Sequence, residues 1–312
     1  MERKISLADV QRAVDNAYEN NKSLKAGEIN DRVKGQVKAS DFGLAVVLTD
    51  GRVIKKAEAD TKFVIGDIAR VAVATALMQQ NTVEEIVKKS GTEPKMKHDP
   101  ADHEIKLHIN KHALRATSAI EPTGDKDGKY NLLVNTLIDM TNGEPVFNDK
   151  VYETLMNEAK EYDIENRLAE RQYVLYDDTA LVIDVYNRLK SLQLSAVEVA
   201  TMGATIAADG VNPDNNNVVY DGSKAAAIVT LLTTVGNKRR KRAQLMEIGL
   251  PVIHSFGGGV LAVLPGFGAI AAYSPEICDE CHASAKGIKA IASIAKELGL
   301  NIFASARVTV EK

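Results

Sequence analysis

Strand-type runs occur near both ends of this chain, and the long stretch between them has a helical pattern. This order constrains the fold more than any other feature. Residues 43–54 form an apolar run interrupted by Asp50-Gly51, a pair that tolerates the positive φ angles of a hairpin turn. Residues 257–273 repeat this arrangement around a Pro-Gly turn, whereas residues 81–245 are mostly helical in pattern. The order predicts an α+β fold whose antiparallel sheet is built from both ends of the chain and flanked by helices.

We expect residues 1–312 to form one domain with two lobes. The sheet lobe would cover approximately residues 1–66 and 246–312, and the helical lobe approximately residues 67–245. Residues 67–77 are apolar or small on nearly every face, which predicts a central helix buried all round. A ligand site is expected between the lobes, where this central helix begins.

Other elements have clear signals of their own. Ser195 with Glu198 makes a capping box for a helix running through Ala208. Residues 8–35 have the pattern of a helix followed by a polar linker, residues 95–131 are the least regular, and Ile302-Phe303 is expected to close the sheet as a strand. In the last helix, apolar residues recur at spacings of three and four and so share one face: Ile288, Ile291, Ala295 and Leu298. The charged residues Lys289, Lys296 and Glu297 point elsewhere.

Composition excludes several classes of protein. The chain has 312 residues, 45% of them hydrophobic and 26% charged, with a net charge of -3, which is typical of a soluble globular protein. No apolar run is long enough to span a membrane, and a balanced charge disfavours nucleic acid as the main partner. Two cysteines form no disulfide framework, and the first residues have no apolar stretch of a secretory signal behind them, so we expect a cytoplasmic protein. No cofactor is indicated.

Segments across most of the chain resemble the serine-dependent glutaminases, which share the fold of the serine β-lactamases and penicillin-binding proteins. In the C-terminal third the resemblance is carried by Gly249-Leu250-Pro251, residues 257–266, Ala269-Ile270-Ala271, Ser274-Pro275-Glu276 and Gly287. Earlier in the chain it is carried by Phe42-Gly43-Leu44-Ala45, Thr49-Asp50-Gly51, Ala59-Asp60, Tyr186, Leu192, Ser195, residues 197–200 and Gly210. The resemblance implies the hydrolysis of L-glutamine to L-glutamate and ammonia, and homo-oligomerisation.

The catalytic positions of that family carry different residues here. Family members use a Ser-x-x-Lys pair at the start of the central helix, in which the lysine region activates the serine. Asp67 stands at the serine position and Arg70 at the lysine position. A carboxylate cannot become an alkoxide, and arginine cannot act as the proton acceptor that a neutral lysine can be. Because the two side chains are one helical turn apart, we expect them to form a salt bridge.

The resemblance also places the family's ligand-binding positions. The family's Lys-Ser-Gly motif aligns with Ile253-His254-Ser255, and the residue after it, which contributes its backbone, aligns with Phe256. The family's two substrate-binding tyrosines align with Lys238 and Glu28. Its substrate glutamate aligns with Leu155, and a neighbouring asparagine aligns with Tyr162 or, if a gap is allowed, with Asn166. The Asn-Ala-Gly motif aligns either with Arg115-Ala116-Thr117 or with Asn131-Leu132-Leu133. Tyr186 is clearly retained.

Two classes of function follow. The first is a glutaminase-family protein that has lost glutamine hydrolysis and acts as a small-molecule binder or a structural, oligomeric protein. The alternative is an active glutaminase with another nucleophile, for which Ser255 is the nearest candidate by position. Asp67 also has a purely structural interpretation as an N-cap of the central helix. A filled apolar core closed by Phe256 and Leu155 would favour the structural role.

Three further clusters allow alternative interpretations. The histidines His98, His103, His108 and His112 indicate either a polar surface insertion, which we favour, or a metal site. The segment from Cys278 to His282 has the Cys-x-x-Cys-His spacing of haem and redox motifs, although two exposed thiols, Cys278 and Cys281, are the simpler interpretation. The five cations from Lys238 to Arg242 are either a solvated surface, a contact for an anionic ligand in the site, or a nucleic-acid contact.

Overall fold

The computed structural model describes residues 5–25, 27–89, 111–170, 172–234, 238–278 and 283–304. Strands from both ends of the chain pair in one five-stranded antiparallel sheet of order β3-β2-β9-β8-β7. Its strands are β2 (Gly43–Leu48), β3 (Val53–Ala57), β7 (Val252–His254), β8 (Gly259–Leu264) and β9 (Gly268–Tyr273). The predicted hairpins at residues 43–54 and 257–273 are thereby confirmed.

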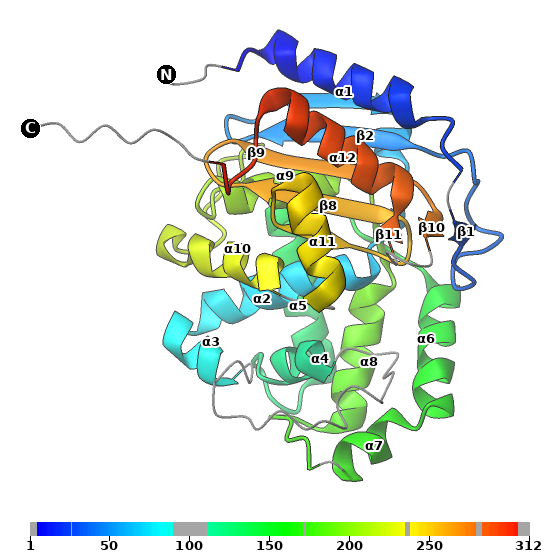
Figure 1. The fold of residues 1–312 in the computed structure, drawn as a ribbon. Helices are drawn as coiled ribbons and strands as arrows, with labels where there is room; N and C mark the ends of the chain where they lie inside the picture. The colour runs from blue at the N-terminus through cyan, green and yellow to red at the C-terminus, as the bar shows by residue number, and fades with distance from the viewer. Residues whose placement is uncertain are drawn as a thin grey trace, which may run out of the picture.

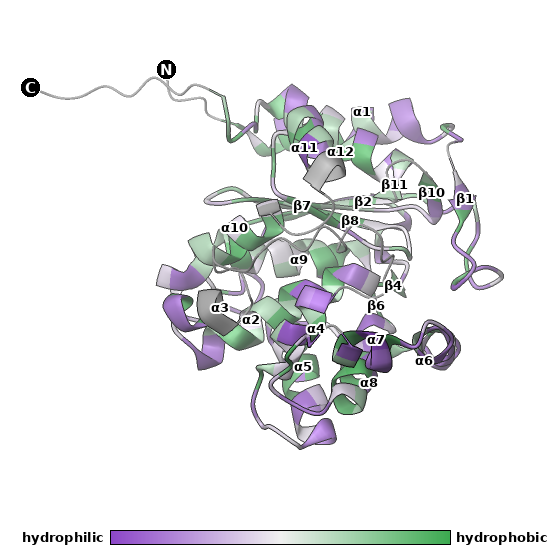
Figure 2. Ribbon diagram, turned by 60° about the horizontal axis from the view of Figure 1, so that its bottom comes forward, coloured by the Kyte–Doolittle hydropathy of each residue, from purple (hydrophilic) through white to green (hydrophobic). Residues whose placement is uncertain are grey.

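Helices cover both faces of this sheet, because alternate side chains along each strand point to opposite faces. On one face lie α1 (Leu7–Asn21) and α12 (Ala285–Leu298), which pack with Leu44, Val46 and Ile270 in one apolar cluster. On the other face α9 (Ala196–Ala207) packs against Ala45, Leu261 and their neighbours. Figure 2 shows the sheet nearly edge-on between these two layers.

The helical region lies beyond α9, as Figure 1 shows. Its helices are α2 (Arg70–Gln80), α3 (Val83–Lys89), α4 (Lys111–Ser118), α5 (Lys126–Thr141), α6 (Asp149–Glu161), α7 (Ile164–Glu170), α8 (Thr179–Lys190) and α10 (Ala225–Thr234). Helix α11 (Lys238–Ile248) lies instead beside α12, on the other face of the sheet (Figure 2). Two small antiparallel sheets flank the main one: β4 (Phe63–Val64), β6 (Leu192–Leu194) and β5 (Val146–Phe147) in one, and β1 (Glu28–Ile29), β10 (Glu276–Cys278) and β11 (Ala283–Ser284) in the other. Within the residues listed above, no helix has the length and apolar character needed to cross a membrane.

Several local predictions are confirmed. The side chain of Ser195 accepts a hydrogen bond from the Glu198 N–H, and Glu198 accepts one from the Ser195 N–H, so the predicted capping box opens α9. In α12 the four predicted core residues are buried, whereas Lys289 and Lys296 are exposed. The central helix α2 is buried along most of its length.

Two local predictions are wrong. Ile302-Phe303 forms no strand: α12 ends at Gly299 in the left-handed conformation, and the chain then turns so that the Ile302 N–H donates to the Gly249 carbonyl. Strands β3 and β7 form the edges of the main sheet instead. Asp67 is not an N-cap, because it lies inside a 3₁₀ turn at Gly66–Ala69 that precedes α2, and no backbone N–H of the described chain donates to its carboxylate.

Candidate functional site

Asp67 and Arg70 form the predicted salt bridge at the start of the central helix. The Arg70 Nη2 lies 2.9 Å from the Asp67 Oδ1, and the Arg70 side chain is 18% exposed against 35% for Asp67. The 3₁₀ turn brings the two side chains together on one side of the chain, one turn apart. Arg70 is held from its other side by Tyr186 of α8, whose hydroxyl accepts a hydrogen bond of 3.4 Å from the Arg70 Nε.

The charges of this group keep every member in its ordinary ionic state. Burial acts to raise the pKa of the Asp67 carboxyl, but the charges of Arg70 and Lys190 outweigh burial and hold that pKa at about 2. The pKa of Arg70 is raised, because the attraction of Asp67 exceeds the effect of burial. Burial raises the pKa of the Tyr186 hydroxyl to about 12. The site therefore holds a carboxylate, a guanidinium and a neutral phenol at neutral pH.

Lys190 is a site residue that the sequence analysis missed. It lies one turn after Tyr186 in the last turn of α8 and is 4% exposed. Its ammonium lies 5.6 Å from the centre of the Tyr186 ring and 5.6 Å from that of the Phe256 ring. Burial lowers its pKa, and Asp67 opposes that effect. The spacing of four residues from Tyr186 was the available signal, since residues i and i+4 share a helix face.

An apolar cluster closes one side of the site. Leu155, which the resemblance is expected to align with the family's substrate glutamate, is buried with Val64 and Val151, and Phe256 packs against them. Beside this cluster Arg32 stacks over the Phe256 ring and makes a bidentate ion pair with Glu158, with a shortest distance of 2.6 Å. This side of the site therefore combines apolar side chains with an arginine that is already paired.

The hydroxyl of Ser255 is fully committed to the loop that carries it. It donates to the Val64 carbonyl at 2.7 Å and accepts from the Gly257 N–H at 2.8 Å, and Ser255 is completely buried. A Cβ on Gly66 would come within 2.7 Å of this hydroxyl and 2.9 Å of the Phe256 ring, so Gly66 allows the two segments to touch. Both hydrogen bonds position the loop and use the Ser255 hydroxyl once as donor and once as acceptor.

The other predicted positions lie around this group or away from it. His254, at the end of β7, is half-buried, and its charge lowers the pKa of Asp67, so it faces the same group. Glu28 is exposed in β1, where it pairs with Ile277. Tyr162 and Asn166 lie after α6 and in α7, and Asn166 donates to Asp163. The side chains of Lys238 and its three basic successors lie outside the described residues, and Arg242 is exposed.

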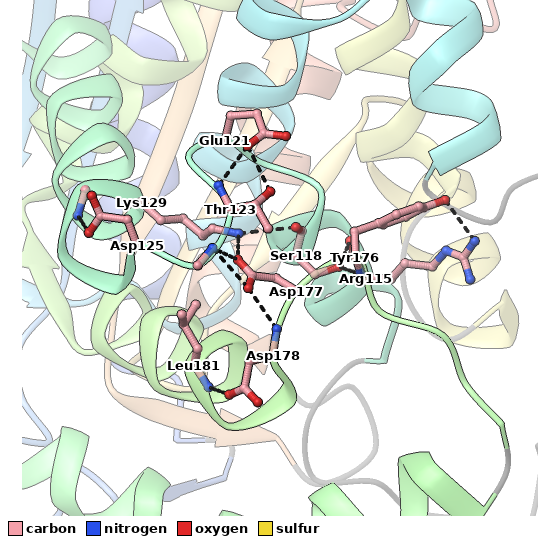
Figure 3. Close-up of polar contacts among 12 residues, drawn as sticks. Arg115, Ser118, Glu121, Thr123, Asp125, Lys129, Tyr176, Asp177, Asp178 and Leu181 are labelled. Atoms are coloured by element: carbon pink, nitrogen blue, oxygen red, sulfur yellow. Dashed lines mark hydrogen bonds and ion pairs between the residues drawn. The ribbon is translucent and has the colours of Figure 1, made fainter.

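The two candidate positions for the Asn-Ala-Gly motif, Arg115 and Asn131, lie on α4 and α5. Asn131 is exposed. Arg115 donates to the Tyr176 hydroxyl, as the right side of Figure 3 shows. Arg115 also donates to the Val174 carbonyl and stacks over the Tyr176 ring. Both contacts tie α4 to the segment that leads into α8.

A buried ion pair fixes this same region. The Lys129 ammonium donates to Asp177 at 2.6 Å and to the Ser118 carbonyl at 3.2 Å, and Asp177 in turn accepts from the Gly124 N–H (Figure 3). All of these groups are paired with one another, which is the pattern of a structural connection between α5 and the loops around it.

The described residues contain no cluster of three or more potential metal ligands. Of the four clustered histidines only His112 is described, and it is exposed on α4 with its ring edge toward Tyr173. Cys278 is a free, half-buried thiol at the end of β10, whereas Cys281 lies outside the described residues.

Comparisons with known proteins agree with the predicted resemblance. The family model described as Glutaminase matches residues 33–303. A glutaminase of Bacteroides thetaiotaomicron is 29% identical, and the match covers 97% of each chain. Glutaminase 1 of Escherichia coli strain K12 is 30% identical, with 94% of this chain and 97% of the relative covered.

Solved structures confirm the predicted β-lactamase-like α+β fold. A probable glutaminase named ybaS superposes with a TM-score of 0.87 at 28% identity, covering 96% of this chain and 100% of the other. The covalent complex of the Bacillus subtilis glutaminase YbgJ with 5-oxo-L-norleucine has a TM-score of 0.79 at 21% identity, covering 95% and 99%. At that identity the second likeness bears on the fold alone.

Proposed function

The chain belongs to the glutaminase family, and from this premise we propose that it has kept the family fold, does not hydrolyse glutamine, and binds a small molecule. One observation carries the proposal: the positions of the nucleophile and its lysine hold Asp67 and Arg70, joined by a 2.9 Å ion pair. A structural role is the second candidate, and the apolar cluster of Leu155 and Phe256 favours it.

The chemistry of the ion pair supports the loss of hydrolysis. A carboxylate with a pKa of about 2 is a weak nucleophile, and the guanidinium beside it has no basic lone pair to offer. Removal of the nucleophile from a serine hydrolase costs on the order of 10⁶ in turnover. Ser255 offers no substitute, because its hydroxyl is hydrogen-bonded within its own loop.

An ammonia-release assay tests this proposal. We expect the wild-type protein to release no ammonia from L-glutamine above the rate in buffer. Ammonia released at an ordinary enzymatic rate would contradict the proposal, and loss of that activity in Ser255→Ala would then identify the alternative nucleophile. An acyl adduct found by intact-mass measurement would contradict it equally.

A double variant, Asp67→Ser with Arg70→Lys, tests whether restoring the family's catalytic residue types is enough to give glutaminase activity. We expect this variant to remain inactive, because Leu155 and Lys190 stand where a zwitterionic substrate would need polar acceptors. Thermal unfolding of both proteins serves as the control that the double variant folds.

The resemblance also supports proposals about assembly and location. We propose that the chain forms homo-oligomers, which light scattering after size-exclusion chromatography measures directly. Val174, Val218 and Met246 are large apolar side chains exposed on the single chain, and they are available for such an interface. We further propose a cytoplasmic location, which cell fractionation tests.

A further inference from the structure

Lys190 combines deep burial with the lack of a polar partner. It is 4% exposed, and within the described parts of the chain its ammonium donates no hydrogen bond and forms no ion pair within 4.0 Å. Its nearest described contacts are the faces of the Tyr186 and Phe256 rings. An ammonium group has three donors, and because the Lys190 Nζ is not among the fully enclosed polar atoms of the described chain, these donors can reach a ligand or water in the site.

The other buried lysines show what this chain does with such a group. Lys129 is paired with Asp177 at 2.6 Å and also donates to a carbonyl. Lys286 faces Glu276 at 3.7 Å and stacks over Phe42. Only Lys190, among the buried lysines that the structure describes, has rings around it and no acceptor.

The charges around Lys190 leave a net positive site. Arg70 is neutralised by Asp67, and Arg32 is neutralised by Glu158. Both pairs are complete by themselves, so the charge of Lys190 is the surplus. The pKa of Lys190 is lowered mainly by burial and further by Arg32 and Arg70, while Asp67 and Glu158 act to raise it, so charges of both signs lie around this ammonium.

From this arrangement we propose that Lys190 binds the carboxylate of a small organic acid that carries no α-ammonium group. The proposal rests on the proposed binding function and specifies its ligand class. A carboxylate is a pure acceptor and makes strong, charge-assisted hydrogen bonds with an ammonium. A ligand ammonium would find Asp67 already held by Arg70 and would meet Leu155 at the family's carboxylate position. The rings of Tyr186 and Phe256 provide apolar contact for the carbon chain of the acid.

Calorimetric titration of the full chain tests the proposal. The probes are glutarate and succinate, with L-glutamine and inorganic phosphate as comparisons. We expect at least one of the two diacids to bind the wild-type protein and L-glutamine to bind more weakly. Lys190→Met should weaken binding of that diacid by about tenfold or more, because a hydrogen bond to a charged group is lost. Lys190→Arg keeps the charge and should retain measurable binding.

Lys286→Met is the matched control, since it removes a lysine that is equally buried and also stacked on a ring but lies beside Glu276. It should leave diacid binding unchanged. Thermal unfolding gives a second reading: the diacid should raise the unfolding temperature of the wild-type protein and of Lys286→Met, and leave that of Lys190→Met unchanged.

Three outcomes would overturn the proposal: no heat from either diacid at millimolar concentration, equal binding by wild type and Lys190→Met, or tighter binding of phosphate or L-glutamine than of both diacids. The diacids contain no amide. Their binding is therefore independent of whether the protein hydrolyses glutamine, so the result of the titration and the result of the ammonia-release assay can be interpreted separately.

Discussion

At the scale of single residues, the site shows how one charged side chain fixes the roles of its neighbours. With a carboxylate at position 67, the cation at position 70 is drawn into an ion pair, and Tyr186 supports that cation through its hydroxyl. Lys190 then remains as a buried cation whose ammonium donates no hydrogen bond within the part of the chain that the structure describes.

The stability of the ion pair gives a pH-dependent prediction. The pKa of Asp67 lies at about 2 in the folded protein, below its ordinary value of 3.8, so its contribution is fully present above about pH 4 and is lost as the pH falls toward 2. Asp67→Asn should lower the free energy of unfolding at pH 6 by about 1 kcal/mol, a small value because the carboxylate is partly exposed and screened.

Urea unfolding at a series of pH values measures this difference. The gap between wild type and Asp67→Asn should shrink as the pH falls from 4 to 2, because protonation then neutralises the wild-type carboxyl as well. Asp31→Asn is the control, since Asp31 is 94% exposed and its loss should leave the profile unchanged. A gap that is constant over this range would argue against the ion pair as a source of stability.

At the scale of the elements, two helices begin with the same motif in different surroundings. A capping box opens α1 at Ser6 and Asp9, on the exposed surface, and another opens α9 at Ser195 and Glu198, where the helix packs on the main sheet. In α9 the Glu198 carboxylate also meets the Lys62 ammonium at 3.1 Å. The second box therefore joins α9 to its neighbours as well as beginning the helix.

This difference predicts unequal costs for the same change. Ser195→Ala should lower the free energy of unfolding by about 1 to 2 kcal/mol, because the part-buried N–H of Glu198 loses its acceptor. Ser6→Ala should cost about 0.5 kcal/mol, since water replaces the lost hydroxyl at an exposed helix end. Chemical denaturation of the two variants makes the comparison, and equal losses would contradict this account of α9.

At the scale of the whole molecule, the contact between α9 and the main sheet joins the two layers on that face. Gly203 lies at the centre of this contact, where an added Cβ would come within 2.5 Å of the Ala269 Cβ and 2.7 Å of the Leu261 Cδ1. The helix can lie this close to β8 and β9 only because Gly203 has no side chain.

Filling that contact should therefore destabilise the whole fold. Gly203→Ala should lower the free energy of unfolding by about 1 to 3 kcal/mol despite the better helix propensity of alanine, because the layers must move apart. Gly203→Leu should prevent folding. Thermal unfolding followed by circular dichroism measures both, with Glu153→Ala on the exposed face of α6 as the control. If Gly203→Ala were more stable than the wild-type protein, α9 and the main sheet would have room for a methyl group between them, and this account of their packing would be wrong.

The sequence by itself determined the features that depend on neighbours within a few residues. The hairpin turns, the face of α12, the capping box of Ser195 and the pairing of Asp67 with Arg70 were all predictable, because turn geometry and helical spacing act locally. The resemblance of its motifs to a known family supplied the fold, which no local rule gives.

Only the tertiary structure decided what these elements meet. It placed the Phe256 ring against the Lys190 ammonium, tied the Ser255 hydroxyl to the Val64 carbonyl, and turned Ile302 away from the sheet toward Gly249. Each of these contacts joins segments that are distant in the chain, or depends on which strands already form the edges of the sheet. Periodicity records which face of an element is buried, but the partner on that face is selected by packing of the whole molecule.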